Sequence, residues 1–187
     1  MPRRAWAAVV TAAAVASCNP FGTGTPDPPA GVVIYPPPTS PENVLATLAL
    51  ALGAKDNLTY LERLTEDFLF RPDPVQAQGD AFRNLPARWG IEQERAFLAA
   101  LMANADSLAL IWQGVLVQPQ GDGARVTANY ELTVWARAGP VSRYTGQADL
   151  LMRQTAGIWS ILSWDDVVRE GMTATWGLLR ADILATG

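Results

Sequence analysis

The second half of this chain alternates apolar and polar residues with a period of two, as a sheet with one buried face requires. From Val126 to Val134 every second residue is apolar and the residues between them are polar. Turns that contain glycine or proline bracket four runs, which we predict to be strands: 107–118, 124–137, 142–154 and 158–168. These turns are short enough for hairpins, so the pattern predicts an antiparallel meander.

The residues before this sheet place apolar side chains at helical spacing. Ser40, Pro41 and Glu42 supply a capping hydroxyl, a proline for the first turn and a carboxylate at the positive end of the helix dipole. We predict a first helix from there to Gly53, followed by helices at 58–64, 91–105 and 173–184 and a strand at 67–71. The proline-bearing stretch 72–89 is expected to be a loop or a broken helix. Helices first and an antiparallel sheet afterwards indicate an α+β domain in which the N-terminal helices pack against the sheet.

The N-terminal residues show a pattern that indicates processing rather than folding. Arg3 and Arg4 precede a mostly apolar run of 13 residues, Ala5 to Ser17, and Cys18 follows directly. The run is too short for a membrane-spanning helix, which needs about 20 residues, and with Cys18 it resembles the lipobox of a bacterial lipoprotein signal peptide. We therefore interpret 1–17 as a signal peptide and Cys18, the only cysteine, as the lipidated first residue of the mature chain. The simpler alternative is an ordinary secretory signal with a cysteine at its cleavage site.

Residues 18–40 are rich in proline and glycine, so we expect neither a helix nor a central strand there. We interpret this segment as the lipidated cysteine and a tether, which holds a domain of residues 41–187 away from the membrane. The apolar island 31–35 within the tether is expected to dock on the domain, with an edge strand as one form of that docking. The predicted location is the bacterial cell envelope, with a lipid anchor in a membrane and the domain facing the periplasm or the exterior.

Composition removes several classes of function. The chain has 14 basic and 18 acidic side chains, which argues against nucleic-acid binding because that needs clustered Lys and Arg. It has no histidine, so nucleophiles activated by histidine are excluded, and the usual ligands of catalytic zinc are missing. The sequence contains no glycine-rich phosphate loop and no metal-ligand spacing, and we expect no metal and no cofactor. Any chemistry would fall on Asp, Glu, Tyr or Arg.

Carboxylates are the first candidates for such chemistry. Glu131 and Asp149 lie at the polar positions of their strands and are expected to face solvent or a partner. Asp165 and Asp166 are adjacent in a strand, so they project to opposite faces and one of them can face the interior. We interpret the cluster 92–95 as capping residues at the start of a helix.

Aromatic residues are the candidates for binding. Tyr60, Phe70, Trp112 and Tyr130 could line an apolar pocket, although they suit a plain core equally well. Trp135 lies at a polar position of its strand, which makes it a candidate for an interface with a second subunit. A homodimer is therefore one predicted assembly.

Three signatures resemble the nuclear transport factor 2-like superfamily over about residues 40–170. They are the helix start Ser40-Pro41-Glu42-Asn43, the run Asp67-Phe68-Leu69-Phe70 and the hairpin residues Gly157-Ile158-Trp159-Ser160-Ile161. The resemblance implies a cone-shaped α+β fold in which helices pack into a strongly curved antiparallel sheet and leave a cavity. The superfamily includes isomerases, dehydratases, epoxide hydrolases, ring-hydroxylase small subunits, transport adaptors and noncatalytic modules, so it leaves the function open.

We therefore predict a membrane-anchored lipoprotein with a noncatalytic module that binds an apolar small molecule or a protein partner. One alternative is an acid/base enzyme, of the isomerase or dehydratase type, that uses Asp and Tyr in the cone cavity. The other is a structural, self-associating envelope protein. An open dry cavity favours ligand binding, an inward carboxylate within hydrogen-bond reach of a tyrosine favours catalysis, and a sealed, aromatic-filled cone favours structural packing.

Overall fold

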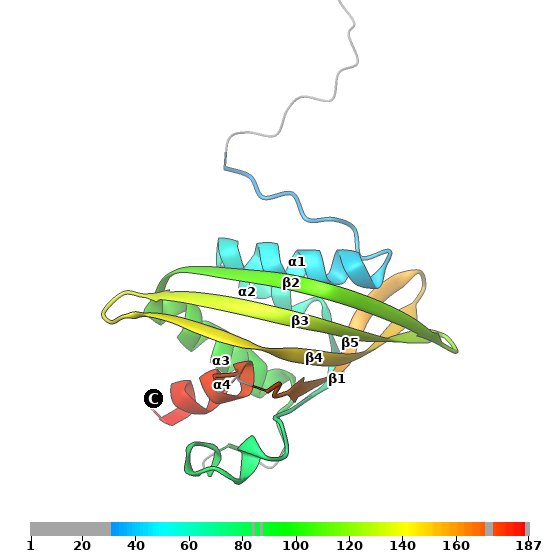
Figure 1. Cartoon of the computed structure of the whole chain (residues 1–187). Helices are drawn as coiled ribbons and strands as arrows, with labels where there is room; N and C mark the ends of the chain where they lie inside the picture. The colour runs from blue at the N-terminus through cyan, green and yellow to red at the C-terminus, as the bar shows by residue number, and fades with distance from the viewer. Residues whose placement is uncertain (1–30, 84, 87, 171–173, 186–187) are drawn as a thin grey trace, which may run out of the picture. The chain divides into compact units, whose positions relative to one another are not determined.

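A curved sheet of five strands organises the folded part of the chain (Figure 1). The computed structural model describes residues 31–83, 85–86, 88–170 and 174–185. The strands are β1 (Leu64–Arg71), β2 (Ala105–Gln120), β3 (Gly123–Ala136), β4 (Val141–Thr155) and β5 (Ile158–Val167). They lie side by side in the order β1-β5-β4-β3-β2, so β1 and β2 form the two edges.

The predicted meander is confirmed. Strands β2 to β5 each pair antiparallel with the next, and Gly121 and Gly157 take positive φ values of 59° and 83° in two of the tight turns. Strand β1 instead runs parallel to β5, which makes the sheet mixed rather than wholly antiparallel. No hairpin turn joins β1 to β5. The chain leaves β1 at one edge of the sheet, enters the sheet again at the opposite edge with β2, and continues through β3 and β4 to β5, which lies beside β1.

Four helices lie on the concave side of the sheet in the described residues (Figure 1): α1 (Pro41–Ala54), α2 (Asn57–Leu61), α3 (Ile91–Asn104) and α4 (Trp176–Ala185). Helix α1 begins as predicted, because Ser40 Oγ accepts a hydrogen bond from the backbone N–H of Asn43 at 3.3 Å. Helix α2 ends before the predicted residue 64, since Leu64 already pairs with Ile161 as the first residue of β1. Helix α4 begins at Trp176, later than predicted, because residues 174 and 175 are not helical; the predicted start at 173 lies outside the described residues.

The inner face of the sheet packs against the helices, and the outer face carries charges. In β3 the buried side chains alternate as predicted, for example Val126, Ala128 and Tyr130. On the outer face Asp149 forms an ion pair with Arg125, and Glu131 forms one with Arg143 at 3.2 Å. Both carboxylates therefore face outward, as the sequence predicts.

The apolar island before α1 docks less closely than expected. Tyr35 Oη donates a hydrogen bond to Asp56 Oδ2 at 2.9 Å, but residues 31–40, all of them described, form no strand, and Ile34 is 66% exposed. The edge-strand form of docking was therefore wrong, since the island makes no ladder with the sheet. The predicted signal peptide, Cys18 and most of the tether lie outside the described residues. Among the described helices, none combines the length and the apolar character that a membrane crossing demands.

The stretch between β1 and α3 is a loop with two short 3-10 turns, Gln76–Gln78 and Asp80–Phe82. Asp73 holds this loop against the end of β5. Its Oδ1 accepts hydrogen bonds from the backbone N–H groups of Val75 and Gln76, and its Oδ2 accepts one from Val168 at 3.1 Å. Burial alone would raise the pKa of Asp73, but these three backbone donors hold it below its usual value.

We expect Asp73→Asn to lower the free energy of unfolding by about 1–3 kcal/mol at pH 7. The side-chain NH2 group of Asn replaces one carboxylate oxygen, so a backbone N–H that donated to that oxygen loses its acceptor. The pKa of Asp73 in the folded protein lies below the unfolded value of about 3.9. The ionised carboxylate therefore contributes its full stabilisation at a pH above about 3.9, and this stabilisation is lost as the pH falls through the folded pKa. Urea unfolding at pH 7 and at about pH 3 should therefore show the gap between wild type and variant closing in acid. The control is Asp80→Asn, which changes an exposed carboxylate of the same loop and should alter stability by less than about 0.5 kcal/mol.

Candidate functional site

A tyrosine and a carboxylate meet inside the curved sheet. Tyr130 on β3 donates a hydrogen bond from Oη to Asp166 Oδ1 on β5 at 2.7 Å, and both residues are buried. Strand β4 lies between these two strands, and Gly146 is the residue of β4 opposite Tyr130. A Cβ atom at Gly146 would lie 2.4 Å from Tyr130 Oη, so the missing side chain is what lets the tyrosine reach across β4. The neighbouring Asp165 faces outward and bonds Arg71, which confirms that the two adjacent aspartates point to opposite faces.

The first turn of α4 closes this pair. The backbone N–H of Trp176 donates to Tyr130 Oη at 2.8 Å, and the backbone N–H of Gly177 donates to Asp166 Oδ2 at 2.7 Å. N–H groups in the first turn of a helix have no acceptor within the helix, so the two sheet residues act together as its cap. Both carboxylate oxygens and the hydroxyl group are therefore engaged within the protein.

Burial sets the protonation behaviour of the pair. It raises the pKa of Asp166 above its ordinary value, although the hydrogen bonds from Tyr130 and Gly177 and the charge of Arg180 oppose that rise. Burial and the nearby Asp166 carboxylate also raise the pKa of Tyr130 far above its ordinary value. Tyr130 thus keeps its proton and serves as a hydrogen-bond donor to Asp166.

A second polar pair joins α3 to α4. Arg180 and Glu94 are both fully buried and bond at two points, Nε to Oε2 at 3.0 Å and Nη2 to Oε1 at 2.7 Å. The indole N–H of Trp89 donates to Glu94 Oε2 at 2.7 Å, and Tyr60 Oη lies 3.5 Å from Oε1. The guanidinium carbon of Arg180 lies 3.8 Å from the centre of the Phe70 ring, which adds a cation–π contact. These contacts make Glu94 part of the interior and correct its interpretation as a capping residue.

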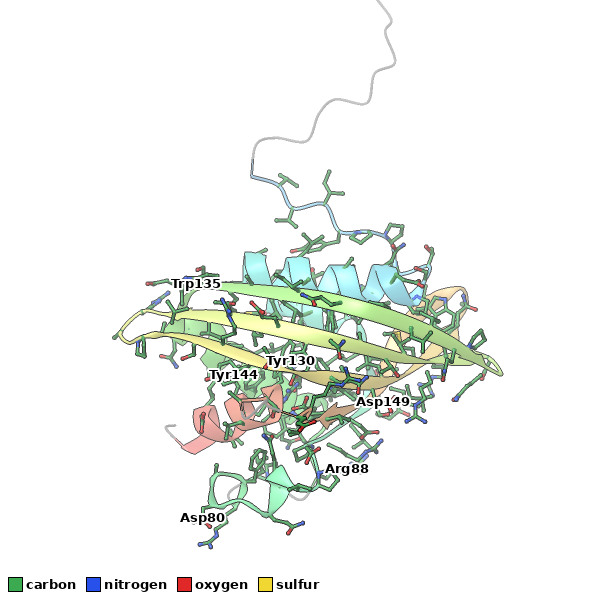
Figure 2. All side chains as sticks on the ribbon, viewed as in Figure 1. Asp80, Arg88, Tyr130, Trp135, Tyr144 and Asp149 are labelled. Atoms are coloured by element: carbon green, nitrogen blue, oxygen red, sulfur yellow. The ribbon has the colours of Figure 1, made fainter. Side chains whose placement is uncertain are left out.

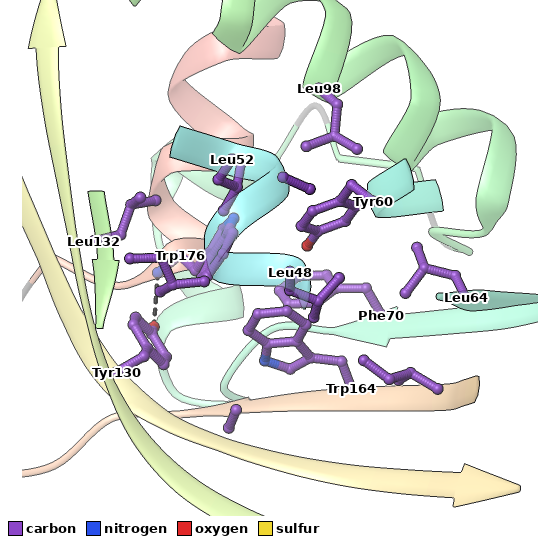
Figure 3. Close-up of a cluster of buried hydrophobic side chains, with 14 of the residues drawn as sticks. Leu48, Leu52, Tyr60, Leu64, Phe70, Leu98, Tyr130, Leu132, Trp164 and Trp176 are labelled. Carbon is purple, nitrogen blue, oxygen red and sulfur yellow. Dashed lines mark hydrogen bonds between the residues drawn. The ribbon is translucent and has the colours of Figure 1, made fainter. Parts of the chain in front are cut away.

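Aromatic rings fill the space between the two polar pairs. Trp176 is fully buried, and its ring centre lies 4.6 Å from that of Trp164, 5.6 Å from that of Tyr130 and 6.5 Å from that of Trp112. Figure 3 shows Trp176 next to Tyr130, with Leu52 of α1 close by. Helix α4 therefore places a large side chain in the interior that the curved sheet surrounds.

The four predicted pocket residues all belong to the core and its edge. Tyr60, Phe70 and Tyr130 are buried, while Trp112 is partly buried and donates its indole N–H to the carbonyl of Leu45 at 3.0 Å. Trp112 lies 6.2 Å from Tyr130, ring centre to ring centre, and Phe70 contacts Trp164. Their role in binding a ligand stays a prediction.

The sequence did not assign Arg180 and Trp176 to this site, although it contained a signal for them. They are four residues apart and so share one face of α4, which also carries the buried Leu179. A guanidinium on an apolar helix face implies a buried carboxylate partner. Nothing in the spacing says that the partner is Glu94, because it lies 86 positions away along the chain.

Two surface features are further candidates for binding. A pocket of about 230 Å³ lies under the 72–89 loop, between Phe70, Phe82, Leu85 and Trp89. On the outer face of the sheet Trp135 is 39% exposed; Figure 2 shows it and Asp149 toward opposite ends of the sheet. Within the described ranges, no three acidic or cysteine side chains are grouped so that they could hold a metal ion.

Comparison with known proteins identifies the fold. No family model and no curated protein matches this sequence. A structure from Novosphingobium aromaticivorans assigned as an aromatic ring hydroxylase is 18% identical, with a TM-score of 0.59 over 74% of this chain and 92% of that chain. A second structure from that organism, assigned as a scytalone dehydratase, is 12% identical, with a TM-score of 0.58 over 73% of this chain and 90% of that one. A third, an NTF2-like protein with a cystatin-like fold, also from that organism, is 18% identical, with a TM-score of 0.51 over 73% and 84%. The domain therefore has the nuclear transport factor 2-like, cystatin-like α+β fold.

Proposed function

We propose that this chain is a lipid-anchored, noncatalytic binding module of the bacterial cell envelope, and that its ligand or partner contacts the surface of the domain. The observation that carries the proposal is the closed interior. Trp176 fills it, and the hydroxyl group of Tyr130 and both oxygens of Asp166 are bonded within the protein. A general acid or base must come within hydrogen-bond distance of its substrate, and these groups face α4 instead.

Two surfaces suit such a module. The pocket beside Phe82 and Trp89 has aromatic walls and a volume that fits a small apolar molecule. The outer face of the sheet around Trp135 fits a protein partner, which includes a second copy of the chain. Sedimentation velocity of wild type and Trp135→Ala measures whether that partner is a second copy.

One observation favours the enzyme alternative. A tyrosine that bonds a buried carboxylate at 2.7 Å is a suitable acid/base pair for an isomerase or a dehydratase, and one structural neighbour is assigned as a scytalone dehydratase. Under this alternative α4 would have to leave the interior before a substrate could enter. The sealed, aromatic-filled interior also favours the structural, self-associating alternative, which needs in addition only the exposed sheet face around Trp135.

The anchor is tested by the mass and location of the mature protein. We expect the mature protein in the membrane fraction, with Cys18 at its N-terminus and a mass increased by acyl chains. Cys18→Ala should leave the signal peptide in place and add no lipid mass. An unmodified thiol on Cys18, or wild-type protein found free of membranes, would refute the anchor.

A further inference from the structure

The outward side of α1 carries no charge. From Val44 to Ala54 the sequence contains no charged residue, and its one polar side chain, Thr47, is buried and bonds the carbonyl of Asn43 at 2.8 Å. A surface helix of a soluble domain normally has charged residues opposite its buried stripe, whereas a helix that is apolar all round is covered. The exposed side of α1 therefore has the composition of a covered surface.

An apolar groove runs along this side of the helix. It has a volume of about 430 Å³, and its lining comes from Val33, from α1 and from the edge strand β2. Leu50 in the groove is 41% exposed. We call this surface the α1 face and define it by six residues: Val33, Ala46, Ala49, Leu50, Gly53 and Ala54.

We propose that the α1 face docks on the membrane that holds the lipid anchor, a proposal that rests on the lipidation of Cys18. Twelve residues separate Cys18 from Gly31, and the described chain joins the domain through Val33, which itself lines the groove. A spacer of this length reaches roughly 40 Å when extended and spans roughly 20 Å as a coil. The anchor thus keeps the α1 face within reach of the bilayer, where even a modest apolar area is enough, because a tethered contact acts at an effective concentration near the millimolar range.

The chemistry of the face favours lipid hydrocarbon rather than charged headgroups. Lys55, the only lysine in the chain, follows α1 and donates to the backbone carbonyl of Ala105, and Glu42 is the charged residue of the first turn. Without basic residues on the face, docking depends on buried apolar area and not on anionic lipids. It should therefore occur on neutral phosphatidylcholine and change little with salt.

Docking is measured with a fluorophore on a single thiol. In the lipidated protein Cys18 is acylated, so Ala46→Cys supplies the only free thiol for an environment-sensitive dye. The control position is Val75→Cys, where the native side chain is 79% exposed. Val75 belongs to the 72–89 loop, and Figure 1 shows this loop on the side of the domain away from α1. The proteins are reconstituted into phosphatidylcholine vesicles with or without nitroxide-labelled lipid. We expect the dye at position 46 to be quenched at least about threefold more strongly than the dye at position 75, at low and high salt alike.

Two further variants separate docking from general proximity. Leu50→Asp places a charge on the α1 face at an exposed position, so the domain should stay folded while quenching at position 46 falls to the value at position 75. Leu151→Asp is the matched control, because Leu151 is 38% exposed on the outer face of the sheet and should leave quenching unchanged. Thermal unfolding of both variants checks that each is folded.

Other outcomes would overturn the proposal. Equal quenching at positions 46 and 75 would mean that the domain moves freely on its tether. A dye at position 46 with blue-shifted emission that nitroxide lipid does not quench would mean that a protein or a second copy covers the face. Protein that fails to float with the vesicles and carries a reactive Cys18 would overturn the anchor as well, and this outcome differs from loss of docking alone.

Discussion

Arg180→Ala is expected to lower the free energy of unfolding by about 3–5 kcal/mol, because it leaves the Glu94 carboxylate buried without its counter-charge. The hydrogen bonds from Trp89 and Tyr60 remain, but neither donor carries a charge. The variant also loses the contact of the guanidinium with the Phe70 ring. Urea unfolding at pH 7 measures the loss. The midpoint urea concentration should fall, while the slope of the unfolding free energy against urea concentration should stay the same.

The matched control for this prediction lies on the same helix as Glu94. Arg95 pairs with Glu92 at 3.6 Å, and both side chains are exposed, so Arg95→Ala should change stability by less than about 0.5 kcal/mol. The double variant Glu94→Gln with Arg180→Met should recover most of the lost stability, because it removes both charges and keeps a side-chain oxygen that accepts the Trp89 N–H. If Arg180→Ala destabilised the protein no more than Arg95→Ala, water would reach Glu94 in solution and the interior would not be closed.

The sheet could be predicted from the sequence because its pattern is local. Strands β3 and β4 alternate along their own length, and Gly121 and Gly157 mark turns that join neighbours. The pairing of β1 with β5 could not be predicted, because no turn connects these strands and a short apolar run fits several positions in a sheet. The same reasoning from parity placed Asp165 and Asp166 on opposite faces, but it could not say that Tyr130 would bond the inward one.

The interior contacts of α4 could not be predicted for a related reason. Helical spacing shows that Trp176, Leu179 and Arg180 share a face, yet it does not say against which surface that face packs. The partners Tyr130, Asp166 and Glu94 come from β3, β5 and α3. The candidate site could therefore be predicted only in part: parity placed Tyr130 and one of the two aspartates on the inner face, and helical spacing predicted a C-terminal helix, but neither showed that this helix packs over the pair.

This closing helix bears directly on the choice between a binding module and an enzyme. Its backbone bonds Tyr130 and Asp166, its arginine bonds Glu94, and its tryptophan fills the space between them. An acid/base mechanism at this pair needs the space that Trp176 occupies. Removing the Trp176 side chain should therefore leave a cavity in the interior. Indole, which has the shape of the removed ring, should fit that cavity.

Trp176→Ala is expected to lower the free energy of unfolding by about 3–5 kcal/mol, since it deletes a fully buried ring that packs on Trp164 and Tyr130. The indole N–H of Trp176 has no hydrogen-bond partner among the described residues, so the loss arises from packing. Trp176→Phe keeps an aromatic ring and should cost less than about half as much. Indole at about ten times its dissociation constant should restore about 1.4 kcal/mol to Trp176→Ala, and thermal unfolding with and without indole measures this.

The response of the wild type to indole decides what the cavity result means. A closed interior predicts that indole stabilises the wild type far less than it stabilises Trp176→Ala, because Trp176 already occupies the interior site and leaves indole only the surface pocket beside Phe82 and Trp89. Trp135→Ala, which removes a partly exposed tryptophan from the outer face, should cost less than about 1 kcal/mol and should show no rescue by indole. If indole stabilised the wild type as strongly as Trp176→Ala, and Leu85→Arg in the surface pocket left that effect intact, the native protein would open beside Tyr130 and Asp166, and the enzyme alternative would then replace the noncatalytic one.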